Sequence, residues 1–368
     1  MLEEATLHRL SVPLGRTLVS GTHNFRTLET VVLDLRAGDY HGTGYAYVFR
    51  PREAAALAAL IADQAEAILG REEQPVRAHW QSLYQRTNYI GQAGLAVMAL
   101  AAVDTALWDI AGQQAGLPLY RMLGAVREDV PVYISGGWLS YPVSELVADV
   151  TSARDRGFRH YKMKVGNSDW RADISRVEKV VAAAGDDVQI MVDANQAWDA
   201  GTAIRAGRAL QSLGVDWFEE PVHSNDLAAH SDVRAALEMR VVTGESLFTR
   251  SGFRPFVEAK AADVLMPDVM RCGGPTEFMN VAVLAGSFGL PVSSHLFTEI
   301  SAHLIAASPN GTLVEYIPGW FDSLFCPQLE FSQGRLRLPT TPGLGLTPAE
   351  QTLRDCAVTD PVVLRAVA

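Results

Sequence analysis

Cysteine is scarce in this chain of 368 residues, and no apolar run approaches the roughly 20 residues that a membrane span needs. The three cysteines, Cys272, Cys326 and Cys356, lie far apart, show no CxxC spacing and leave an odd count. That pattern argues against both a zinc site and a disulfide framework. The opening segment MLEEATLHRL also lacks the basic and then apolar layout of a signal peptide. Together these absences predict a soluble, cytoplasmic protein.

Positive charge is in short supply, because 31 Lys and Arg stand against 42 Asp and Glu, for a net charge of −11. Such a chain has no general attraction for nucleic acid or an anionic membrane, and we expect neither as a partner. A small anionic substrate would need local positive charge. Two lysines and a bound cation could supply that charge.

The order of strand-like and helical patterns divides the chain into parts. A length of 368 residues favours one large domain plus a smaller one. Residues 1–127 combine strand-like stretches at 30–35 and 42–49 with helical stretches at 53–69 and 95–116, which predicts a small α+β domain. The tail, 326–368, contains LPTTPGLGLTP, which has too much Pro and Gly for a long helix. We expect this tail to return to the first domain.

Residues 128–325 show a different rhythm, in which short β-rich runs are separated by roughly 20 to 30 residues that contain a helix. The strand candidates are PVYISGG, HYKMKVG, QIMVDAN, VDWFEEP, RVVTGES, ADVLMPD, LPVSSHL and TLVEYIP. Eight βα repeats predict a TIM-type (β/α)8 barrel, and the alternative is a doubly wound open sheet.

Ionisable residues end seven consecutive strand candidates, from the second to the eighth. In strand order they are Lys162 and Lys164, Asp193 (followed by Asn195), Glu219 and Glu220, Glu245, Asp268, His295, and Glu315. A single carboxylate after a strand is often only a helix N-cap or a surface charge. Active sites of TIM barrels, however, are built from the C-terminal ends of several strands at once. The set therefore predicts an active site at this end of the barrel.

Three of the carboxylates, Asp193, Glu219 and Glu245, lie on neighbouring strands and are spaced 26 residues apart in each step. Carboxylates brought so close would repel one another unless a cation lay between them. A ligand set of hard oxygens without His or Cys suits Mg²⁺, with Mn²⁺ as a substitute. A structural salt-bridge network is the competing interpretation, and it would have to use the two lysines of YKMKVG.

Lys162 and Lys164 are two residues apart, so on a strand both side chains face the barrel mouth. Like charge from the other lysine and from a divalent ion would lower the pKa of a lysine there, so that it can act as a base near neutral pH. The alternative for such a pair is a solvated strand edge. The position at the end of a buried strand favours the catalytic interpretation.

His295 and Asp268 end adjacent strand candidates, so the carboxylate can hold one ring nitrogen while the other faces the substrate. This arrangement predicts a second base on the opposite side of the site from Lys164. We expect His303, in the helical SAHLIAA, to be an ordinary structural histidine.

The motifs together resemble the enolase superfamily, specifically its mandelate-racemase branch. They are YKMKVG, VDANQ, WFEEP, TGES, MPDVMRCGG, SSHLFTEISAHLIAASP and VEYIP, and VDTALWDIAG resembles the end of the family's N-terminal capping domain. The resemblance covers nearly the whole chain. It implies a (β/α)8 barrel with an N-terminal α+β capping domain that the C-terminal tail completes, in a homo-oligomer ranging from a dimer to an octamer.

The resemblance also implies roles for the strand-end residues. It implies that the α-proton of a carboxylate substrate is removed to give an enolate stabilised by one Mg²⁺ ion. The implied roles are Lys164 and the His295–Asp268 dyad as the two bases, Asp193, Glu219 and Glu245 as metal ligands, Lys162 as a contact of the substrate carboxylate, and Glu315 as a hydrogen-bond donor to it. Glu219 is preferred to Glu220 because the family also has a single-acid EQP form of this motif.

Substrate specificity is expected to come chiefly from the loop at residues 20–26, which offers His23, Asn24 and Arg26, with Asn195 as a further contact. These side chains suit a substrate with several hydroxyls or a second acid group better than a phenyl ring. We therefore expect an acid-sugar dehydratase. The alternatives are a racemase or epimerase of a 2-hydroxy acid, a sugar-lactone cycloisomerase, and a non-catalytic scaffold, which would be expected to have lost a ligand or a base. Trp138, Trp320 and Phe321 could pack on a sugar chain or fill the core.

Overall fold

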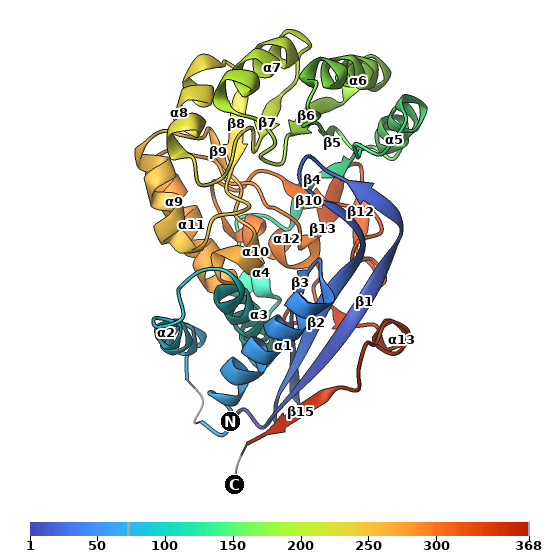
Figure 1. Cartoon of the computed structure of the whole chain (residues 1–368). Helices are drawn as coiled ribbons and strands as arrows, with labels where there is room; N and C mark the ends of the chain where they lie inside the picture. Colours follow the sequence, from blue (N-terminus) through green and yellow to red (C-terminus); the bar gives the residue numbers. More distant parts are fainter. Residues whose placement is uncertain (72–73, 367–368) are drawn as a thin grey trace.

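The computed structural model describes residues 1–71 and 74–366, which form an α+β capping unit against a barrel (Figure 1). The capping sheet contains β1 (Glu4–Val19), β2 (Asn24–Ala37) and β3 (Tyr40–Val48), paired antiparallel in sequence order. Its helices are α1 (Pro51–Glu66), α2 (Val76–Arg86), α3 (Leu95–Ala115) and the short α4 (Leu119–Met122).

Helix α3 packs against the sheet so closely that glycine is required at the contact. A Cβ atom on Gly44 of β3 would lie 1.8 Å from the carbonyl oxygen of Ala102 in α3, closer than any side chain permits. Gly116 ends the helix in the left-handed conformation that favours glycine. The predicted helical stretches at 53–69 and 95–116 thus correspond to α1 and α3.

The expectation that no apolar segment approaches a membrane span needs one correction. Helix α3 is long and apolar enough by length and composition, but 89% of its most apolar window is buried inside the protein. A helix that is apolar on all sides is one that other elements of the protein cover. Here the covering elements include α1, α2 and β3.

The second unit is a barrel of parallel strands with helices outside it. The strands are β4 (Asp129–Gly136), β5 (His160–Lys164), β6 (Gln189–Asp193), β7 (Trp217–Glu219), β8 (Arg240–Thr243), β9 (Val264–Leu265) and β10 (Val314–Tyr316), and β10 pairs with β4. The helices are α5 (Val143–Asp155), α6 (Trp170–Ala184), α7 (Ala200–Ser212), α8 (Leu227–Ala236), α9 (Thr249–Glu258), α10 (Val269–Cys272), α11 (Pro275–Ser287) and α12 (Thr298–Ala307), with the 3-10 turn η1 (Gly185–Asp187) after α6. The predicted fold class is confirmed.

The seventh predicted strand, LPVSSHL, forms isolated parallel bridges in place of a regular strand. Val292 bridges to Leu265 on one side and to Gly311 on the other, and His295 bridges to Asp268. Proline at position 291 cannot donate a hydrogen bond, and Leu296 adopts a positive φ of 47°, so the extended segment is short. The bridges still close the barrel between β9 and β10.

The C-terminal tail contacts both units. The hairpin of β12 (Glu330–Ser332) and β13 (Arg335–Arg337) joins β4, whereas β15 (Val362–Arg365) pairs antiparallel with β1. Strand β11 (Phe325–Cys326), which precedes this hairpin in the chain, pairs with β14 (Thr347–Pro348), and the short helix α13 (Glu350–Asp355) follows β14. The domain boundaries at 127/128 and 325/326 stay predictions.

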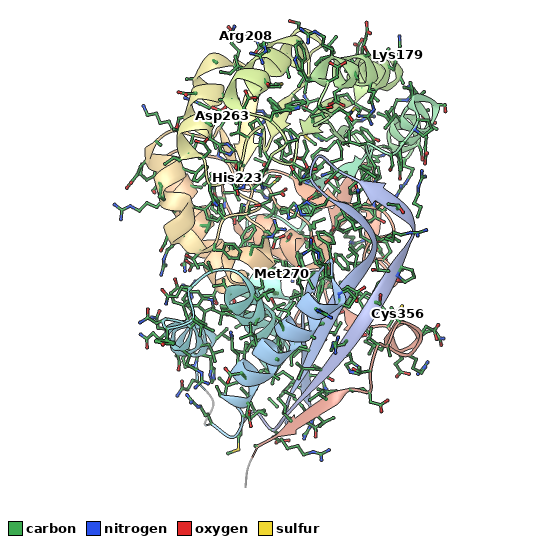
Figure 2. All side chains as sticks on the ribbon, in the orientation of Figure 1. Lys179, Arg208, His223, Asp263, Met270 and Cys356 are labelled. Carbon is green, nitrogen blue, oxygen red and sulfur yellow. The ribbon has the colours of Figure 1, made fainter. Side chains whose placement is uncertain are left out.

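Buried polar contacts connect the capping unit to the barrel. The carboxylate of Asp104 in α3 accepts hydrogen bonds from the backbone N–H of Thr276, at 2.8 Å, and from its hydroxyl, and so caps α11 of the barrel. The N–H of Tyr47 in β3 lies 3.4 Å from Sδ of Met270, a residue of α10 labelled in Figure 2. These contacts hold the edge of the capping sheet over the C-terminal ends of the barrel strands.

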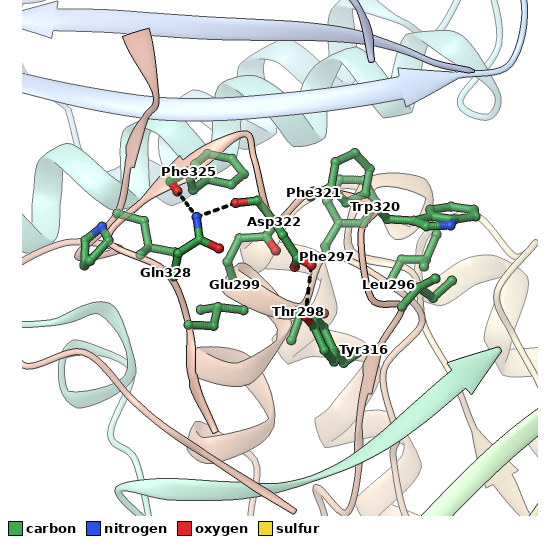
Figure 3. A pocket seen from close by; sticks show the side chains of 14 residues that line it. Leu296, Phe297, Thr298, Glu299, Tyr316, Trp320, Phe321, Asp322, Phe325 and Gln328 are labelled. Carbon is green, nitrogen blue, oxygen red and sulfur yellow. Dashed lines mark hydrogen bonds between the residues drawn. The ribbon is translucent and has the colours of Figure 1, made fainter. Parts of the chain in front are cut away.

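A further contact joins β3 to α12, where the hydroxyl of Tyr45 donates a hydrogen bond to the buried carboxyl of Glu299. Glu299 lines a small cavity of about 30 Å³, shown in Figure 3 together with Asp322 and Gln328. Burial raises the pKa of Glu299 to about 8. The folded protein therefore holds this carboxyl in its neutral form at pH 7.

Stability should consequently depend on pH through Glu299. The unfolded chain loses this proton near pH 4.5 and the folded chain near pH 8, so the free energy of unfolding falls as the pH rises between these values. Glu299→Gln should reduce the difference in unfolding free energy between pH 5 and pH 8 by on the order of 3 kcal/mol. Urea unfolding at both pH values measures this difference. Exposed Glu258→Gln is the control, and an equal effect of the two substitutions would contradict the assignment.

Candidate active site

Asp193, Glu219 and Glu245 converge at the C-terminal ends of β6, β7 and β8. Asp193 and Glu219 are direct partners in the parallel register of β6 and β7, and Glu245 follows β8 by two residues. One oxygen of each carboxylate lies within 4.8 Å of the others, and all three residues are buried. The structure therefore brings the three predicted metal ligands together.

Two oxygens of this cluster are arranged as ligands of a cation would be. Within residues 1–71 and 74–366, Glu219 Oε2 and Glu245 Oε2 are buried and have no hydrogen-bond donor, although His295 Nε2 lies 3.3 Å from the second. Buried carboxylate oxygens normally have partners, because desolvation is otherwise uncompensated. A set of carboxylate oxygens fits Mg²⁺ or Mn²⁺. The residues present thus fit a hard divalent cation.

The lysines alone do not neutralise the cluster. Lys162 Nζ lies 2.5 Å from Glu219 Oε1, and Lys164 Nζ lies 2.5 Å from Asp193 Oδ2. The nearest cationic atom to the Glu245 carboxylate, apart from the ring of His295, is Nη1 of Arg271 at 3.9 Å. The salt-bridge network therefore exists, but it leaves the third carboxylate of the cluster without a lysine.

Glu220 is directed away from this cluster, as the choice of Glu219 requires. Its carboxyl accepts hydrogen bonds from the Thr243 hydroxyl and from the N–H of Gly244, at 3.1 Å for the latter. Burial, with the charge of Glu245, raises the pKa of Glu220 to about 8. A neutral carboxyl at pH 7 is a poor ligand for a divalent cation.

Lys162 lies at the centre of a buried network of charged and polar groups. The side chain is fully buried, and its ammonium also lies 2.8 Å from Glu315 Oε1 and 3.4 Å from the Tyr133 hydroxyl. Burial alone would lower the pKa of Lys162, but the charges of Glu219 and Glu315 raise it well above its ordinary value. Lys162 is therefore held as a positive charge, which suits its predicted contact with the substrate carboxylate, and that contact stays a prediction.

Glu315, predicted as a hydrogen-bond donor to the substrate, makes acceptor contacts within the protein, and its role toward the substrate stays a prediction. Burial would raise the pKa of its carboxyl, but the charges of Lys162, His295 and Lys164 lower it to about 2. The ionised carboxylate accepts a hydrogen bond from the N–H of Leu296 at 2.8 Å. In this structure Glu315 is an acceptor that holds Lys162 in place.

His295 and Asp268 form the predicted dyad. Nδ1 of His295 lies 2.6 Å from Asp268 Oδ2, while Asp268 Oδ1 accepts a hydrogen bond from the backbone N–H of Arg271 at 2.8 Å. Burial would lower the pKa of His295, but the charge of Glu245 and the hydrogen bond to Asp268 raise it. The carboxylate of Asp268 thus orients the ring and leaves Nε2 directed toward the acidic triad, 3.3 Å from Glu245 Oε2.

A cavity of about 100 Å³ lies between the strand ends and the capping unit. Six of the predicted site residues line it: His23, Lys164, Asn195, Glu245, His295 and Glu315. Four others, Lys162, Asp193, Glu219 and Asp268, lie beneath it and are fully buried. The N–H and side-chain amide of Asn195 hold Asp193 at 2.7 and 3.0 Å.

Arg26 does not line this cavity, which corrects the prediction that it contacts the substrate there. Arg26 is exposed, whereas its neighbour Phe25 is buried and faces the cavity. Successive side chains of a strand point to opposite faces, and β2 already includes both residues. The sequence alone did not reveal that β2 begins at Asn24.

The sequence analysis missed several lining residues, chiefly Arg271, Gln196 and Ser246. Arg271 could have been noticed in MPDVMRCGG, where it follows the end of the sixth strand candidate by three residues. Of the aromatic residues left open, Trp138 and Trp320 line the cavity and stack on each other with ring centroids 5.9 Å apart. Phe321 lines the separate cavity beside Glu299.

The fold and the site together define an enolase-type enzyme, a barrel with an acidic triad at its mouth and a capping domain above it. Residues 6–124 match the mandelate racemase / muconate lactonizing enzyme N-terminal domain, and residues 145–352 match the enolase C-terminal domain-like family. The chain belongs to the mandelate racemase/muconate lactonizing enzyme family of the enolase superfamily.

Similar proteins include enzymes that act on acid sugars. The chain is 34% identical to an L-talarate/galactarate dehydratase of Salmonella typhimurium, over 88% of this chain and 81% of that protein. It is 32% identical to a 3,6-anhydro-alpha-L-galactonate cycloisomerase of Streptomyces coelicolor, over 94% and 96%. A crystal structure of the Salmonella dehydratase, liganded with Mg and L-lyxarohydroxamate, superposes with a TM-score of 0.94 at 31% identity, over 99% of this chain and 94% of that one.

Removal of one carboxylate from the triad should abolish metal binding while the barrel stays folded. Asp193→Asn or Glu219→Gln removes a charged oxygen ligand. Substitution of a residue that only orients a metal ligand already lowers metal affinity by up to ~100-fold, so loss of the ligand itself should weaken Mg²⁺ binding by more than this. Titration calorimetry with Mg²⁺ measures the affinity, and circular dichroism checks the fold. Glu220→Gln is the matched control and should bind Mg²⁺ as the unsubstituted protein does. Tight binding by both triad variants would rule out this site.

Proposed function

We propose that this protein removes the α-proton of a small carboxylate substrate in a Mg²⁺-dependent reaction and dehydrates a sugar-derived hydroxy acid. The observation that carries the proposal is the position of Lys164 and His295. Both line one cavity, one at the end of β5 and the other after β9, and the three strands that bear the acidic triad lie between them. Two proton-transfer groups thus lie on opposite sides of one binding position.

Charge in the site suits an enolate. Removal of a proton next to a carboxylate creates a second negative charge, and preorganised positive groups are usually the largest catalytic contribution. Lys162 is held charged and buried beneath the cavity, where it can approach the substrate carboxylate. A divalent cation bound by the triad would supply Lewis-acid stabilisation of the same oxygens.

Dehydration uses the same groups in sequence. Lys164 accepts the α-proton, and a hydroxyl on the β carbon then leaves as water when the imidazolium of His295 protonates it. Asp268 supports the dehydration by holding Nδ1 of His295, so that Nε2 carries the proton toward the substrate. The carbon skeleton can pack on Trp138 and Trp320, whose stacked rings form part of the cavity wall.

The names of the relatives support this choice. Besides the Salmonella dehydratase, an arabinonate dehydratase and an L-rhamnonate dehydratase are 32% and 30% identical to this chain. Cycloisomerisation of a sugar lactone is the second candidate, because the Streptomyces cycloisomerase is matched over nearly its whole length. Racemisation would use the same two bases without loss of water.

We also expect the protein to form a homo-oligomer.

The overall reaction is tested with a panel of acid sugars and sugar lactones in the presence of Mg²⁺. Formation of a 2-keto acid, detected by semicarbazone absorbance and by NMR, supports dehydration. Opening or isomerisation of a lactone without a keto product supports cycloisomerisation, and inversion of the α-centre supports racemisation. Absence of any α-proton exchange across the panel would overturn the proposal.

The two bases should each handle one face of the enolate. With epimeric substrates in D2O, Lys164→Ala should lower the rate of α-proton exchange of one epimer by ~1,000-fold or more and leave the rate of the other epimer unchanged. His295→Asn should do the reverse. Asp268→Asn should have a weaker form of the His295 effect, because it misorients the ring without removing it. Proton NMR of recovered substrate measures the exchange. If His295→Asn exchanged both epimers as the unsubstituted protein does, the two-base arrangement would be wrong.

A further inference from the structure

We infer that Arg271 binds a second acid group of the substrate, so that the preferred substrate is a sugar diacid and not a sugar monoacid. This inference rests on the proposed function and adds to it the class of substrate. The function requires one carboxylate at Lys162 and the metal triad. It does not require a further cation in the cavity wall, and the wall contains one in Arg271.

The guanidinium of Arg271 is fixed at one edge and open at the other. Nη1 donates to the backbone carbonyl of Glu245 at 3.0 Å and lies 3.5 Å from the Ser246 hydroxyl. The hydrogen bonds of this side chain within the described part of the chain use Nη1 alone, and 24% of the side chain is exposed. Nε and Nη2 therefore remain available for the two oxygens of a carboxylate, which a guanidinium binds in a bidentate manner.

The charge of Arg271 is also differently balanced from that of the two lysines. Lys162 and Lys164 each lie 2.5 Å from a carboxylate of the triad. Two acids lie near Arg271. Glu245 Oε1 lies 3.9 Å from Nη1, and Asp268 accepts a hydrogen bond from the backbone N–H of Arg271. A divalent cation on the triad would share the charge of Glu245, which leaves Asp268 as the main acid that balances Arg271, so a substrate carboxylate at Nε and Nη2 would add a favourable charge interaction.

Apart from the charged strand-end residues Lys164, Glu245, His295 and Glu315, the cavity wall has an apolar arc and a polar arc, and Arg271 lies in the polar arc. Leu296, Ile317, Trp320 and Trp138 follow the seventh, eighth and first strand positions, which are adjacent in the closed barrel. Asn195, Gln196, Ser246 and Arg271 follow strands β6, β8 and β9 across the mouth. A chain of carbons with polar groups on one side fits such a wall, with its carbons on the rings and its oxygens on the polar arc.

Space continues beyond Arg271. A second hollow of about 300 Å³ shares Tyr47, Phe49 and Arg271 with the 100 Å³ cavity and is otherwise lined by side chains that include Glu53, Met98 and Met270. Arg271 therefore stands where the inner cavity meets an outer one. A substrate whose first carboxylate lies at the triad would direct its far end toward this boundary, where an acid group finds the guanidinium.

The experiment compares matched pairs that differ only at the far end, such as galactarate with galactonate and glucarate with gluconate. The unsubstituted protein should turn over the diacid of a pair with a kcat/KM ~10- to 100-fold above that of the monoacid. Arg271→Gln should reduce this ratio to near one, mainly through a higher KM for the diacid, because the lost contact is made equally in the ground and transition states. Arg271→Lys should retain only part of the ratio, since an ammonium cannot bind both carboxylate oxygens in the planar bidentate manner of a guanidinium.

Binding is measured separately in a Lys164→Ala background, which stops turnover. Calorimetry should show weaker binding of galactarate when Arg271→Gln is added, and a smaller change for galactonate. Arg254→Gln is the matched control, because Arg254 lies on α9, is exposed and pairs with Glu258 outside the cavity. The control should leave the diacid-to-monoacid ratio as it is.

Three outcomes would overturn the inference. A protein that prefers monoacids would retain the proposed dehydration but not the diacid preference. If Arg271→Gln lowered kcat/KM equally for both members of each pair and also weakened Mg²⁺ binding, Arg271 would only hold Glu245 in position. Failure to act on any acid sugar would remove the proposed function itself, and that result is distinct from the other two.

Discussion

Repulsion among the three carboxylates of Asp193, Glu219 and Glu245 is the constraint on which the rest of the site depends. Their oxygens lie within 4.8 Å of one another in a buried place, so opposite charge must be close by. Lys162 and Lys164 supply part of it from β5. Within the described residues, Glu219 Oε2 has no hydrogen-bond donor, and Glu245 has only the ring of His295 at 3.3 Å and Arg271 at 3.9 Å as cationic neighbours. The cluster thus couples cation binding to the state of the lysine expected to act as a base.

The capping unit and the barrel divide the work of the site. The barrel provides charged groups at fixed strand ends, and the capping unit closes the cavity with residues 20–25 and with Tyr47 and Phe49 of β3 and the segment after it. Buried contacts such as Asp104 with Thr276 keep the two parts in register. In this chain, substrate contacts can therefore come from the cap and the polar arc while the strand ends hold the proton-transfer groups.

Much of the barrel could be predicted because parallel strands leave a periodic record of apolar runs with polar ends. The strand ends are also the positions of the candidate site residues, so the triad and the His295–Asp268 dyad could be named from strand order, with the family resemblance needed to choose Glu219 over Glu220. Arg271 could have been noticed just after the sixth strand candidate, but it lies on α10, and nothing in its spacing shows that its side chain faces the cavity. The placement of Arg26 in the cavity was wrong for a related reason. Which side chains of a strand face the cavity cannot be known from the sequence until the first residue of β2 is known.

The sequence by itself determined the barrel with its capping domain and the residues that meet at the barrel mouth, since strand order and the parallel direction force their ends together. The protonation states were decided only by the tertiary structure. Lys162 is held charged and Glu315 ionised because each lies against the other in a buried place, while burial keeps the carboxyls of Glu220 and Glu299 neutral at pH 7. Such shifts arise from distances of a few ångströms between residues far apart in the chain, and no local pattern contains those distances.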